Sequence, residues 1–239
     1  MDGHPRQDPA YRLATAKPRR SADGGASSSP GPGEERRTKP ADGYAQGVRP
    51  TAAEIVARLG LERHPEGGWF RETYRSDEAV ATARGTRAVA TAILFLVTPA
   101  SPSRFHRLAS DELWVFHGGL PLELITLDAD GPANVRLLGD ATSARDVVPQ
   151  ALVPAGAWQA ARVAGTHEAG WAALIEGGAG ARGGADRTGP PGAIGEERRW
   201  SLVSCLVAPG FAYEDFELAR REDLLRQCPA EAELILALT

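Results

Sequence analysis

The chain is poor in cysteine and lysine and lacks a long apolar run, and each shortage excludes a class of protein. Two cysteines in 239 residues, Cys205 and Cys228, cannot form the disulfide framework of a small secreted domain. The longest apolar run, Ala88–Val97, is much shorter than the roughly 20 residues that a membrane-spanning helix needs. The N-terminus has no apolar segment of the kind that secretory signals carry. These absences predict a cytoplasmic protein with reduced thiols and no membrane partner.

Net charge also argues against nucleic acid as a partner. The formal net charge is −4 at pH 7, whereas nucleic-acid-binding domains are usually basic. Both lysines, Lys17 and Lys39, lie near the start of the chain, and every other cation is an arginine. Acidic residues are mixed into that same stretch, which argues against a nucleic-acid-binding arm. We therefore expect no nucleic-acid partner.

Two segments have the composition of flexible chain. Residues 1–49 are rich in proline, glycine, serine and charge and contain almost nothing apolar. Such a segment cannot offset the entropy lost on ordering, so the sequence predicts a disordered leader over 1–49 and a single domain over 50–239. Within that domain, Gly177–Arg198 contains eight glycines and two prolines. This composition predicts a flexible insertion at about 177–198, either a lid over a pocket or a passive loop.

The rest of the chain has the pattern of a mainly β domain with a helix at each end. Thr51 and Glu54 have the spacing of a capping box, which predicts a short helix ending at Gly60. About ten short strand-like segments follow, separated by turn-prone residues, and this spacing indicates a sandwich or barrel. They are Trp69–Arg75, Ala88–Val97, Ser103–Leu108, Glu112–His117, Leu122–Leu127, Val135–Leu138, Ala151–Val153, Trp158–Val163, Gly170–Glu176 and Trp200–Val207. Two helices, Ala219–Gln227 and Ala230–Leu238, are expected at the end.

Polar side chains are densest between Phe105 and His117. His106 ends one predicted strand and Glu112 opens the next, so the two can meet across a hairpin. Such a pair positions a general acid or base, holds a divalent metal, or simply locks the hairpin with a hydrogen bond. Strand alternation places Glu112 and Trp114 on one face and His117 on the other. His117 therefore needs a bulge to reach the same site.

A second group of candidates follows the turn Glu66-Gly67-Gly68. Arg75 is a candidate clamp for a carboxylate or phosphate, or a partner in an ion pair at the surface. Tyr74 is a candidate proton donor. Trp114 and Trp158 are expected to line or close the barrel, although burial in the core explains them equally well. Two further residues are given no functional role: His64 is interpreted as structural and Cys205 as an inert buried thiol.

Four stretches of the sequence have the spacing of known motifs, namely His64–Ser76, Phe105–Trp114, Val153–Ala161 and Val207–Glu217. The spacing of His106, Glu112 and Gly119 matches the first cupin motif, and Pro154, Gly156 and Gln159 match the second. With these stretches the chain resembles the DUF985, or cupin-5, family of the RmlC-like cupin superfamily. The resemblance runs from about Thr51 to Thr239 and implies a double-stranded β-helix, which is a cupin jelly-roll barrel, with a central pocket and usually a homodimer.

The departures from the cupin motifs concern the metal ligands. Leu108 stands where the first motif has its second histidine, and Gln159 stands where the second motif has its histidine. A metal, if one binds, would be held by His106, Glu112 and Gln159, which is a poor set for a transition metal. We therefore expect no cofactor, with a divalent transition metal as the alternative.

Three functions follow from this resemblance. The first is a metal-independent isomerase or epimerase acting on a small polar metabolite, since epimerases of this fold pair a histidine with a carboxylate and a tyrosine. In that hypothesis His106, Glu112 and Tyr74 are catalytic, and Arg75, Trp114 and Gln159 contact the substrate. The second is a non-catalytic metabolite-binding module, and the third is a metal-dependent enzyme such as an oxygenase. A homodimer is expected to form through Trp69–Arg75, because an exposed sheet edge must be covered.

Overall fold

The computed structural model describes residues 49–127, 132–142, 145–165 and 195–239. The predicted leader, apart from Arg49, lies outside the described residues. So do the predicted strand Gly170–Glu176 and the predicted insertion up to residue 194. The last part of that insertion forms a short 3-10 helix, η3 (Glu196–Arg198).

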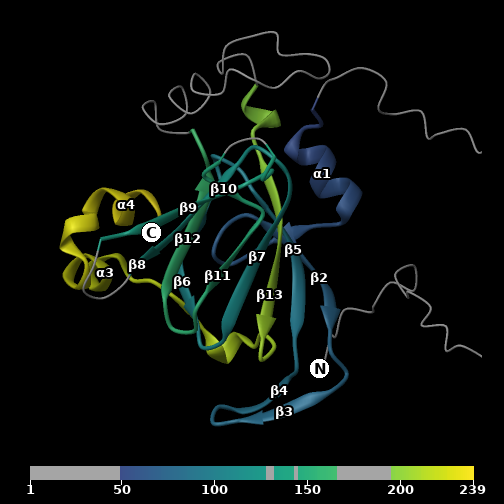
Figure 1. The fold of residues 1–239 in the computed structure, drawn as a ribbon, viewed down its shortest axis with the longest axis vertical. Helices are drawn as coiled ribbons and strands as arrows, with labels where there is room; N and C mark the ends of the chain where they lie inside the picture. Colours follow the sequence, from purple (N-terminus) through teal and green to yellow (C-terminus); the bar gives the residue numbers. More distant parts are fainter. Residues whose placement is uncertain (1–48, 128–131, 143–144, 166–194) are drawn as a thin grey trace, which may run out of the picture. The chain divides into compact units, whose positions relative to one another are not determined.

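Two six-stranded sheets face each other and form a jelly-roll barrel of the double-stranded β-helix type (Figure 1). The first sheet has the order β1 (Glu62–Arg63), β2 (Trp69–Arg75), β5 (Thr91–Val97), β13 (Ser201–Ala208), β7 (Asp111–Gly119), β11 (Gln150–Val153). The second has the order β10 (Val147–Val148), β9 (Asn134–Leu138), β8 (Leu122–Leu127), β12 (Trp158–Val163), β6 (Ser103–Leu108), β14 (Phe216–Leu218). The mainly β fold predicted from the sequence is confirmed.

The core fills the space between the sheets because the strands alternate. Along β13, every second residue from Ser201 to Val207 is buried. The largest fully buried side chains between the sheets include Phe95, Trp114 and Leu124. Burying a side chain of this size contributes about 1.5–3 kcal/mol, so the inward rows of the two sheets are the main source of stability.

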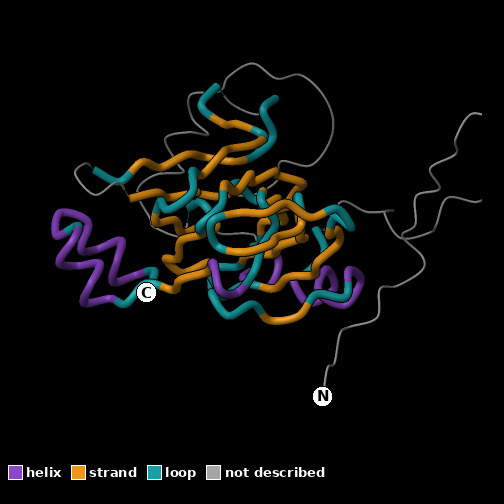
Figure 2. Tube along the Cα trace, turned by 90° about the horizontal axis from the view of Figure 1, so that it is seen from below, coloured by secondary structure: helices purple, strands orange, loops and turns teal. Residues whose placement is uncertain are grey.

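Helices lie on the outer faces of the two sheets, the N-terminal helix beside the first sheet and the C-terminal helices beside the second (Figures 1 and 2). The predicted capping box is present at α1 (Ala52–Leu59), with Thr51 accepting from the Glu54 amide and Glu54 accepting from the Thr51 amide. The last two helices, α3 (Arg221–Gln227) and α4 (Ala232–Ala237), bury Leu224 and Ile235 against the second sheet and are joined by η5 (Pro229–Glu231). Within the described residues, no helix is long and apolar enough to cross a membrane.

A hairpin of β3 (Ala79–Thr82) and β4 (Gly85–Ala88) replaces the start of the predicted strand Ala88–Val97. Its residues are mostly exposed, so they carry no alternating apolar pattern. The hairpin is fixed at Asp215, whose carboxylate accepts two hydrogen bonds from Arg87 (2.8 and 3.0 Å) and lies 3.3 Å from Arg84. Asp215 ends η4 (Tyr213–Asp215), so the hairpin is tied to the segment that follows β13.

Candidate functional site

A cavity of about 130 Å³ opens into the barrel between the inner faces of the two sheets. Strands β2, β5, β6, β7 and β13 contribute to it, together with the turn before β2 and the segment after β13. Its polar lining consists of His64, Glu66, Glu72, Arg75, Thr91, His106, Glu112, Cys205 and Tyr213. Phe70, Ile93, Leu108, Val207, Phe211 and Ala212 complete the wall. A buried cavity of this mixed character is typical of a small-molecule site.

Glu66 is the best-connected carboxylate in the cavity. It is only 6% exposed, and Oε1 accepts a hydrogen bond from the Ser103 hydroxyl at 2.8 Å. Oε2 lies 3.3 Å from Nδ1 of His64 and 3.4 Å from Nε2 of His106. Burial alone would raise the pKa of Glu66, but the two imidazoles and Ser103 outweigh it and hold the pKa below its usual value. The structure therefore favours a charged carboxylate at this position.

The turn that carries Glu66 needs its two glycines. Gly67 and Gly68 have φ angles of 115° and 66°, which other residues rarely adopt. A Cβ on Gly67 would lie 2.0 Å from the Pro102 carbonyl oxygen, and one on Gly68 would lie 2.8 Å from the Phe95 ring. The turn can press against the core only because both side chains are absent, and this contact sets the position of Glu66.

The orientation of His106 follows from a hydrogen bond to the backbone. Its Nδ1 lies 2.8 Å from the carbonyl oxygen of Arg104, and a carbonyl can only accept. Nδ1 is therefore assigned the proton. Nε2 is the nitrogen that faces Glu66, and the ring is 2% exposed. The carboxylate in contact with His106 is thus Glu66, whereas the sequence predicted Glu112.

The side-chain amide of Gln159 binds the carboxyl group of Glu112 and fixes its orientation. Gln159 donates from Nε2 to Glu112 Oε2 at 2.5 Å and accepts at Oε1 from Trp114 Nε1 at 3.0 Å. The pairing of β12 with β6 places Gln159 opposite His106, which brings the amide to this point. Burial and the charge on Glu66 raise the pKa of Glu112 against the opposing effect of His106. Glu112 therefore takes up a proton more readily than an ordinary glutamate does.

Cys205, on β13, lies close to Glu112 of the neighbouring strand β7. Both cysteines are free and buried. Burial, followed by the nearby carboxylates of Glu112 and Glu66, raises the pKa of Cys205 well above its usual value. The side chain is therefore a thiol and not a reactive thiolate, in line with its interpretation from the sequence.

A bulge in β2 determines which side chains of this strand line the cavity. Pairing with β5 shifts register between Glu72 and Tyr74, so Thr73 is an extra residue. Glu72 and Arg75 then lie on the same side and form two hydrogen bonds, Nε to Oε1 at 3.0 Å and Nη2 to Oε2 at 2.6 Å. Arg75 also donates from Nη1 to the Phe211 carbonyl at 3.3 Å. Tyr74 turns outward, is 52% exposed and does not line the cavity.

The predicted site residues therefore fall into three places. His106, Glu112 and Arg75 line the cavity. Gln159 and Trp114 lie behind the wall, where they support Glu112. The proton-donor role predicted for Tyr74 and the substrate contact predicted for Trp114 do not agree with these positions, because one side chain is outside the cavity and the other is fully buried.

His117 and Trp158 also lie away from the cavity. A bulge between β7 and β13 leaves His117 without a paired residue, yet the ring stays on the outer face, 2.5 Å from the Ser204 hydroxyl. Trp158 lies under Arg107, whose guanidinium is 4.5 Å from the indole centroid. The expectation that Trp158 lines the barrel is therefore wrong.

Glu66 and His64 are the functional candidates that the sequence analysis did not select. They precede a Gly-Gly turn, and polar residues in turns are usually exposed. The sequence signal that points to them is the glycine pair. Two adjacent glycines indicate a turn whose backbone packs closely against other atoms, so that residues next to the turn can be buried.

The donor set does not fit a metal ion. Among the described residues, no three His, Cys, Asp or Glu side chains converge as metal ligands. Both ends of the Gln159 amide are already used, and the raised pKa of Glu112 disfavours the ionised form that a metal needs. We therefore derive no chemistry through a metal.

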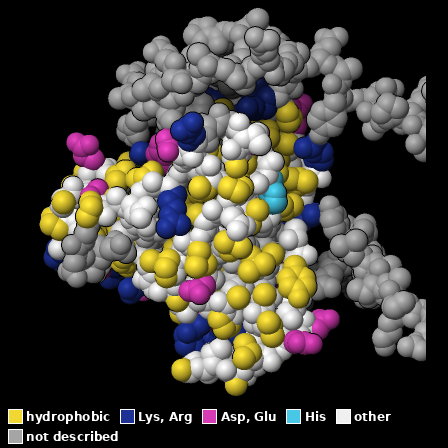
Figure 3. Space-filling model, viewed as in Figure 1, with side chains coloured by type: hydrophobic (Ala, Val, Ile, Leu, Met, Phe, Trp, Pro, Cys, Tyr) yellow, Lys and Arg dark blue, Asp and Glu magenta, His cyan; other side chains and the backbone are white. Residues whose placement is uncertain are grey.

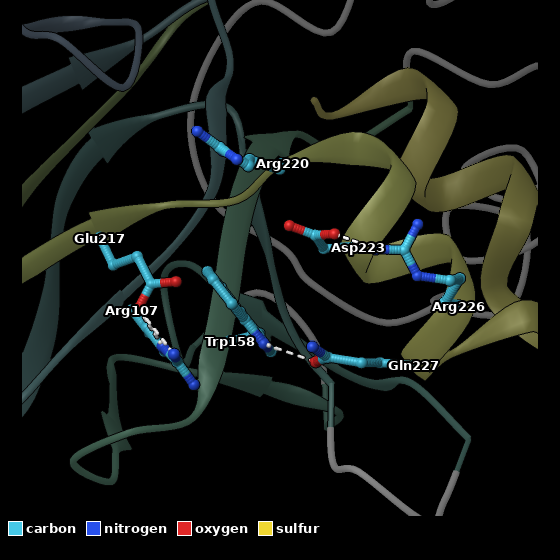
Figure 4. Close-up of a pocket in the computed structure, with 7 residues that line it drawn as sticks. All are labelled: Arg107, Trp158, Glu217, Arg220, Asp223, Arg226 and Gln227. Atoms are coloured by element: carbon cyan, nitrogen blue, oxygen red, sulfur yellow. Dashed lines mark hydrogen bonds and ion pairs between the residues drawn. The ribbon is translucent and has the colours of Figure 1, made fainter.

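A second hollow, of about 230 Å³, lies outside the barrel between β6, β12, β14 and α3 (Figure 4). Arg107 pairs with Glu217, Arg226 pairs with Asp223, and Trp158 donates to Gln227 at 3.3 Å. Its charged groups thus mostly neutralise one another. No histidine is among the described residues that line it. The cavity of the barrel, with its buried imidazoles and carboxyl groups, is the better candidate site.

Comparison with known proteins agrees with this architecture. The Cupin_5 family, described as "Cupin superfamily (DUF985)", matches residues 53–219. A hypothetical protein from Leishmania major is 33% identical with a TM-score of 0.63, covering 80% of this chain and 99% of its own. A protein from Shewanella oneidensis is 29% identical with a TM-score of 0.61, covering 80% and 98%. No curated protein matches the chain. The chain belongs to the Cupin_5 (DUF985) family of the cupin superfamily.

Proposed function

We propose that the barrel binds a small polar metabolite and moves a proton next to its carbonyl group, as a metal-independent isomerase or epimerase. The observation that carries this proposal is the opposite perturbation of two buried carboxyl groups in one cavity. Glu66 has a lowered pKa and Glu112 a raised one. Opposite shifts place a carboxylate that can stabilise a charged imidazole and a carboxyl group that can donate a proton in the same cavity.

His106 is the base in this mechanism. Nδ1 is bound to the Arg104 carbonyl, so Nε2 accepts a proton from the carbon next to the substrate carbonyl. The Glu66 carboxylate, 3.4 Å away, stabilises the imidazolium that forms. Glu112 donates its proton to the carbonyl oxygen as the C–H electron pair becomes the C=C bond of an enol. In the second step Glu112 takes back a hydroxyl proton as the carbonyl reforms and carbon is protonated. Delivery of the proton by His106 to the neighbouring carbon of an enediol gives the isomer. Delivery by solvent to the opposite face, with His106 releasing its proton to solvent, gives the epimer.

The remaining residues position these groups. Gln159, with Trp114 behind it, holds Glu112 so that its other oxygen is available to the cavity. Arg75 and Tyr213 contact the substrate at the mouth. The cavity has a volume of about 130 Å³, and one water-sized position needs about 10–15 Å³. The cavity therefore accommodates a ligand of roughly ten non-hydrogen atoms.

A non-catalytic binding module is the second candidate, and one observation favours it. Among the described residues, the one fully buried side-chain nitrogen or oxygen without a hydrogen-bond partner is Nη1 of Arg49, which does not line the cavity. A network that is satisfied without ligand is typical of a rigid binding site.

Hydrogen–deuterium exchange separates the two candidates. Hydroxyaldehydes and hydroxyketones of about three to six carbons are incubated with the protein in D₂O, and exchange of the C–H next to the carbonyl is followed by NMR. Wild type and the matched control His117→Asn should catalyse exchange, while His106→Asn and Glu112→Gln should lose it by about 100-fold or more. Saturable binding of a member of this set without exchange would support the binding module. Exchange that persists in His106→Asn would refute the mechanism.

The proposal extends to assembly and location. Within the described residues, β1 pairs only with Trp69 and Phe70 of β2, and no strand pairs with Glu72–Arg75 on the side away from β5. The first sheet also exposes Tyr74, Leu152 and Leu206, and Figure 3 shows hydrophobic side chains scattered over the visible face. We expect this edge to be covered by the second subunit of a two-fold homodimer in the cytoplasm. A monomer at micromolar concentration in light scattering would contradict the homodimer.

A further inference from the structure

The mouth of the cavity already contains a complete ion pair. We use the name mouth for Glu72, Arg75, Phe211 and Tyr213. Glu72 accepts from both Nε and Nη2 of Arg75, and the Phe211 carbonyl accepts from Nη1. An anionic substrate would have to displace a carboxylate that belongs to the protein and is held next to Arg75 by the β2 bulge. Arg75 is therefore poorly available as an anion clamp.

Carboxyl side chains outnumber guanidinium groups in the lining. Among the described residues that line the cavity, Glu66, Glu72 and Glu112 carry carboxyl groups and Arg75 carries the guanidinium. The surroundings of the mouth are acidic as well. Burial and then the carboxylates of Glu62, Glu66 and Glu72 raise the pKa of Tyr213.

Two aromatic rings lie at the mouth of the cavity. Phe211 and Tyr213 both line the cavity, and their ring centroids are 5.1 Å apart at 79°. Aromatic faces attract cations and give anions no comparable contact. Rings combined with an excess of carboxylates form a surface that favours an ammonium group.

We propose that the metabolite in this cavity carries a positively charged amino group at the end that faces the mouth. The ligand is then a small amino-carbonyl or amino-hydroxycarbonyl compound, with its carbonyl between His106 and Glu112. This inference rests on the proposed function and names its substrate class. Glu72 and the rings of Phe211 and Tyr213 select the charge, while the inner residues act on the carbonyl end.

Binding of three matched probes tests the charge preference. Ethanolamine, ethylene glycol and glycolate have the same length and end in an ammonium, a hydroxyl or a carboxylate group. Each is titrated at pH 6.5 and constant ionic strength, and the backbone amide of Phe211, which donates to Thr91 Oγ1, reports binding by NMR. Ethanolamine should bind about tenfold more tightly than ethylene glycol, and glycolate should bind least. Equal affinities, a preference for glycolate, or no response to any probe would overturn the proposal.

A pair of variants assigns the preference to the mouth. Glu72→Gln removes the carboxylate and frees Arg75, so affinity for ethanolamine should fall about fivefold and glycolate should gain. Glu217→Gln removes a comparable carboxylate from Arg107 in the outer hollow and should change nothing. An unchanged preference in Glu72→Gln would refute the role of Glu72. The preference is measured without turnover, so loss of deuterium exchange with the preference intact would refute only the proton transfer.

Discussion

Glu66 Oε2 lies 3.4 Å from Nε2 of His106, the ring nitrogen that is not bound to the backbone. The contact joins a turn before β2 to the end of β6 and forms inside the barrel. Ser103, on the same strand as His106, binds the other oxygen of the carboxylate. Glu66 is therefore part of the fold as well as of the candidate site, and its removal should affect both.

Glu66→Gln should lower stability most at neutral pH. The pKa of Glu66 is lowered in the folded state, so its charge stabilises the protein above the usual glutamate pKa and loses this effect as the pH falls through the folded value. We expect a loss of about 2 kcal/mol at pH 7, or roughly 6 °C in melting temperature. The difference from wild type should shrink below about pH 4.5. Melting curves between pH 3 and 8 measure it, and a difference that grows in acid would contradict the assignment.

Glu112→Gln should have the opposite dependence on pH. The pKa of Glu112 is raised in the folded state, so wild type loses stability as the pH rises from the usual glutamate value to the folded value. A glutamine has no proton to lose and still accepts from Gln159. The melting temperature of the variant relative to wild type should therefore increase between pH 4 and 8. An unchanged difference over this range would mean that Glu112 is ionised in the fold.

The strand β2 shows how far sequence periodicity reaches. Its limits, Trp69–Arg75, are predicted correctly because aromatic and β-branched residues stand between a Gly-Gly turn and polar residues. Alternation alone groups Glu72 with Tyr74, however, and the bulge at Thr73 groups Glu72 with Arg75. A bulge depends on pairing with β5, which local sequence does not encode. Tyr74, a site candidate because of its residue type, therefore lies outside the cavity.

The same limit applies to buried polar residues. Alternation within β7 correctly separates Glu112 and Trp114 from His117, because the pairing with β13 is regular as far as Phe116 and the bulge leaves His117 on the outer face. Glu66 becomes buried only when its turn meets Ser103 and His106, 37 and 40 positions further along the chain. Such a contact follows from the topology of the sheets. The motif resemblance located His106, Glu112 and Gln159, but not the carboxylate that contacts the histidine.

Gly67→Ala should disturb both the fold and the site. The added Cβ would meet the Pro102 carbonyl oxygen at 2.0 Å, and the φ angle of 115° is unfavourable for alanine. We expect a loss of roughly 3 kcal/mol in unfolding free energy, measured by urea denaturation. Gly156→Ala is the matched control, since it has a φ of 83° but nothing within 4 Å of the added atom. Its loss should be about 1 kcal/mol. Equal losses would show that the contact with Pro102 does not constrain the turn.

Metal content tests the donor set directly. Wild type purified without added metal should contain no stoichiometric transition metal, because Gln159 is bound to Glu112 and Trp114, and the raised pKa of Glu112 disfavours the ionised form that binds a metal. The variant Leu108→His with Gln159→His restores the two histidines that the cupin motifs imply and removes the amide that holds Glu112. Leu108 lines the cavity, so its imidazole would enter the same space as His106. This variant should bind a divalent transition metal at about one equivalent by elemental analysis. A stoichiometric metal in wild type would instead make His106 and Glu112 ligands and exclude the proposed proton transfer between them.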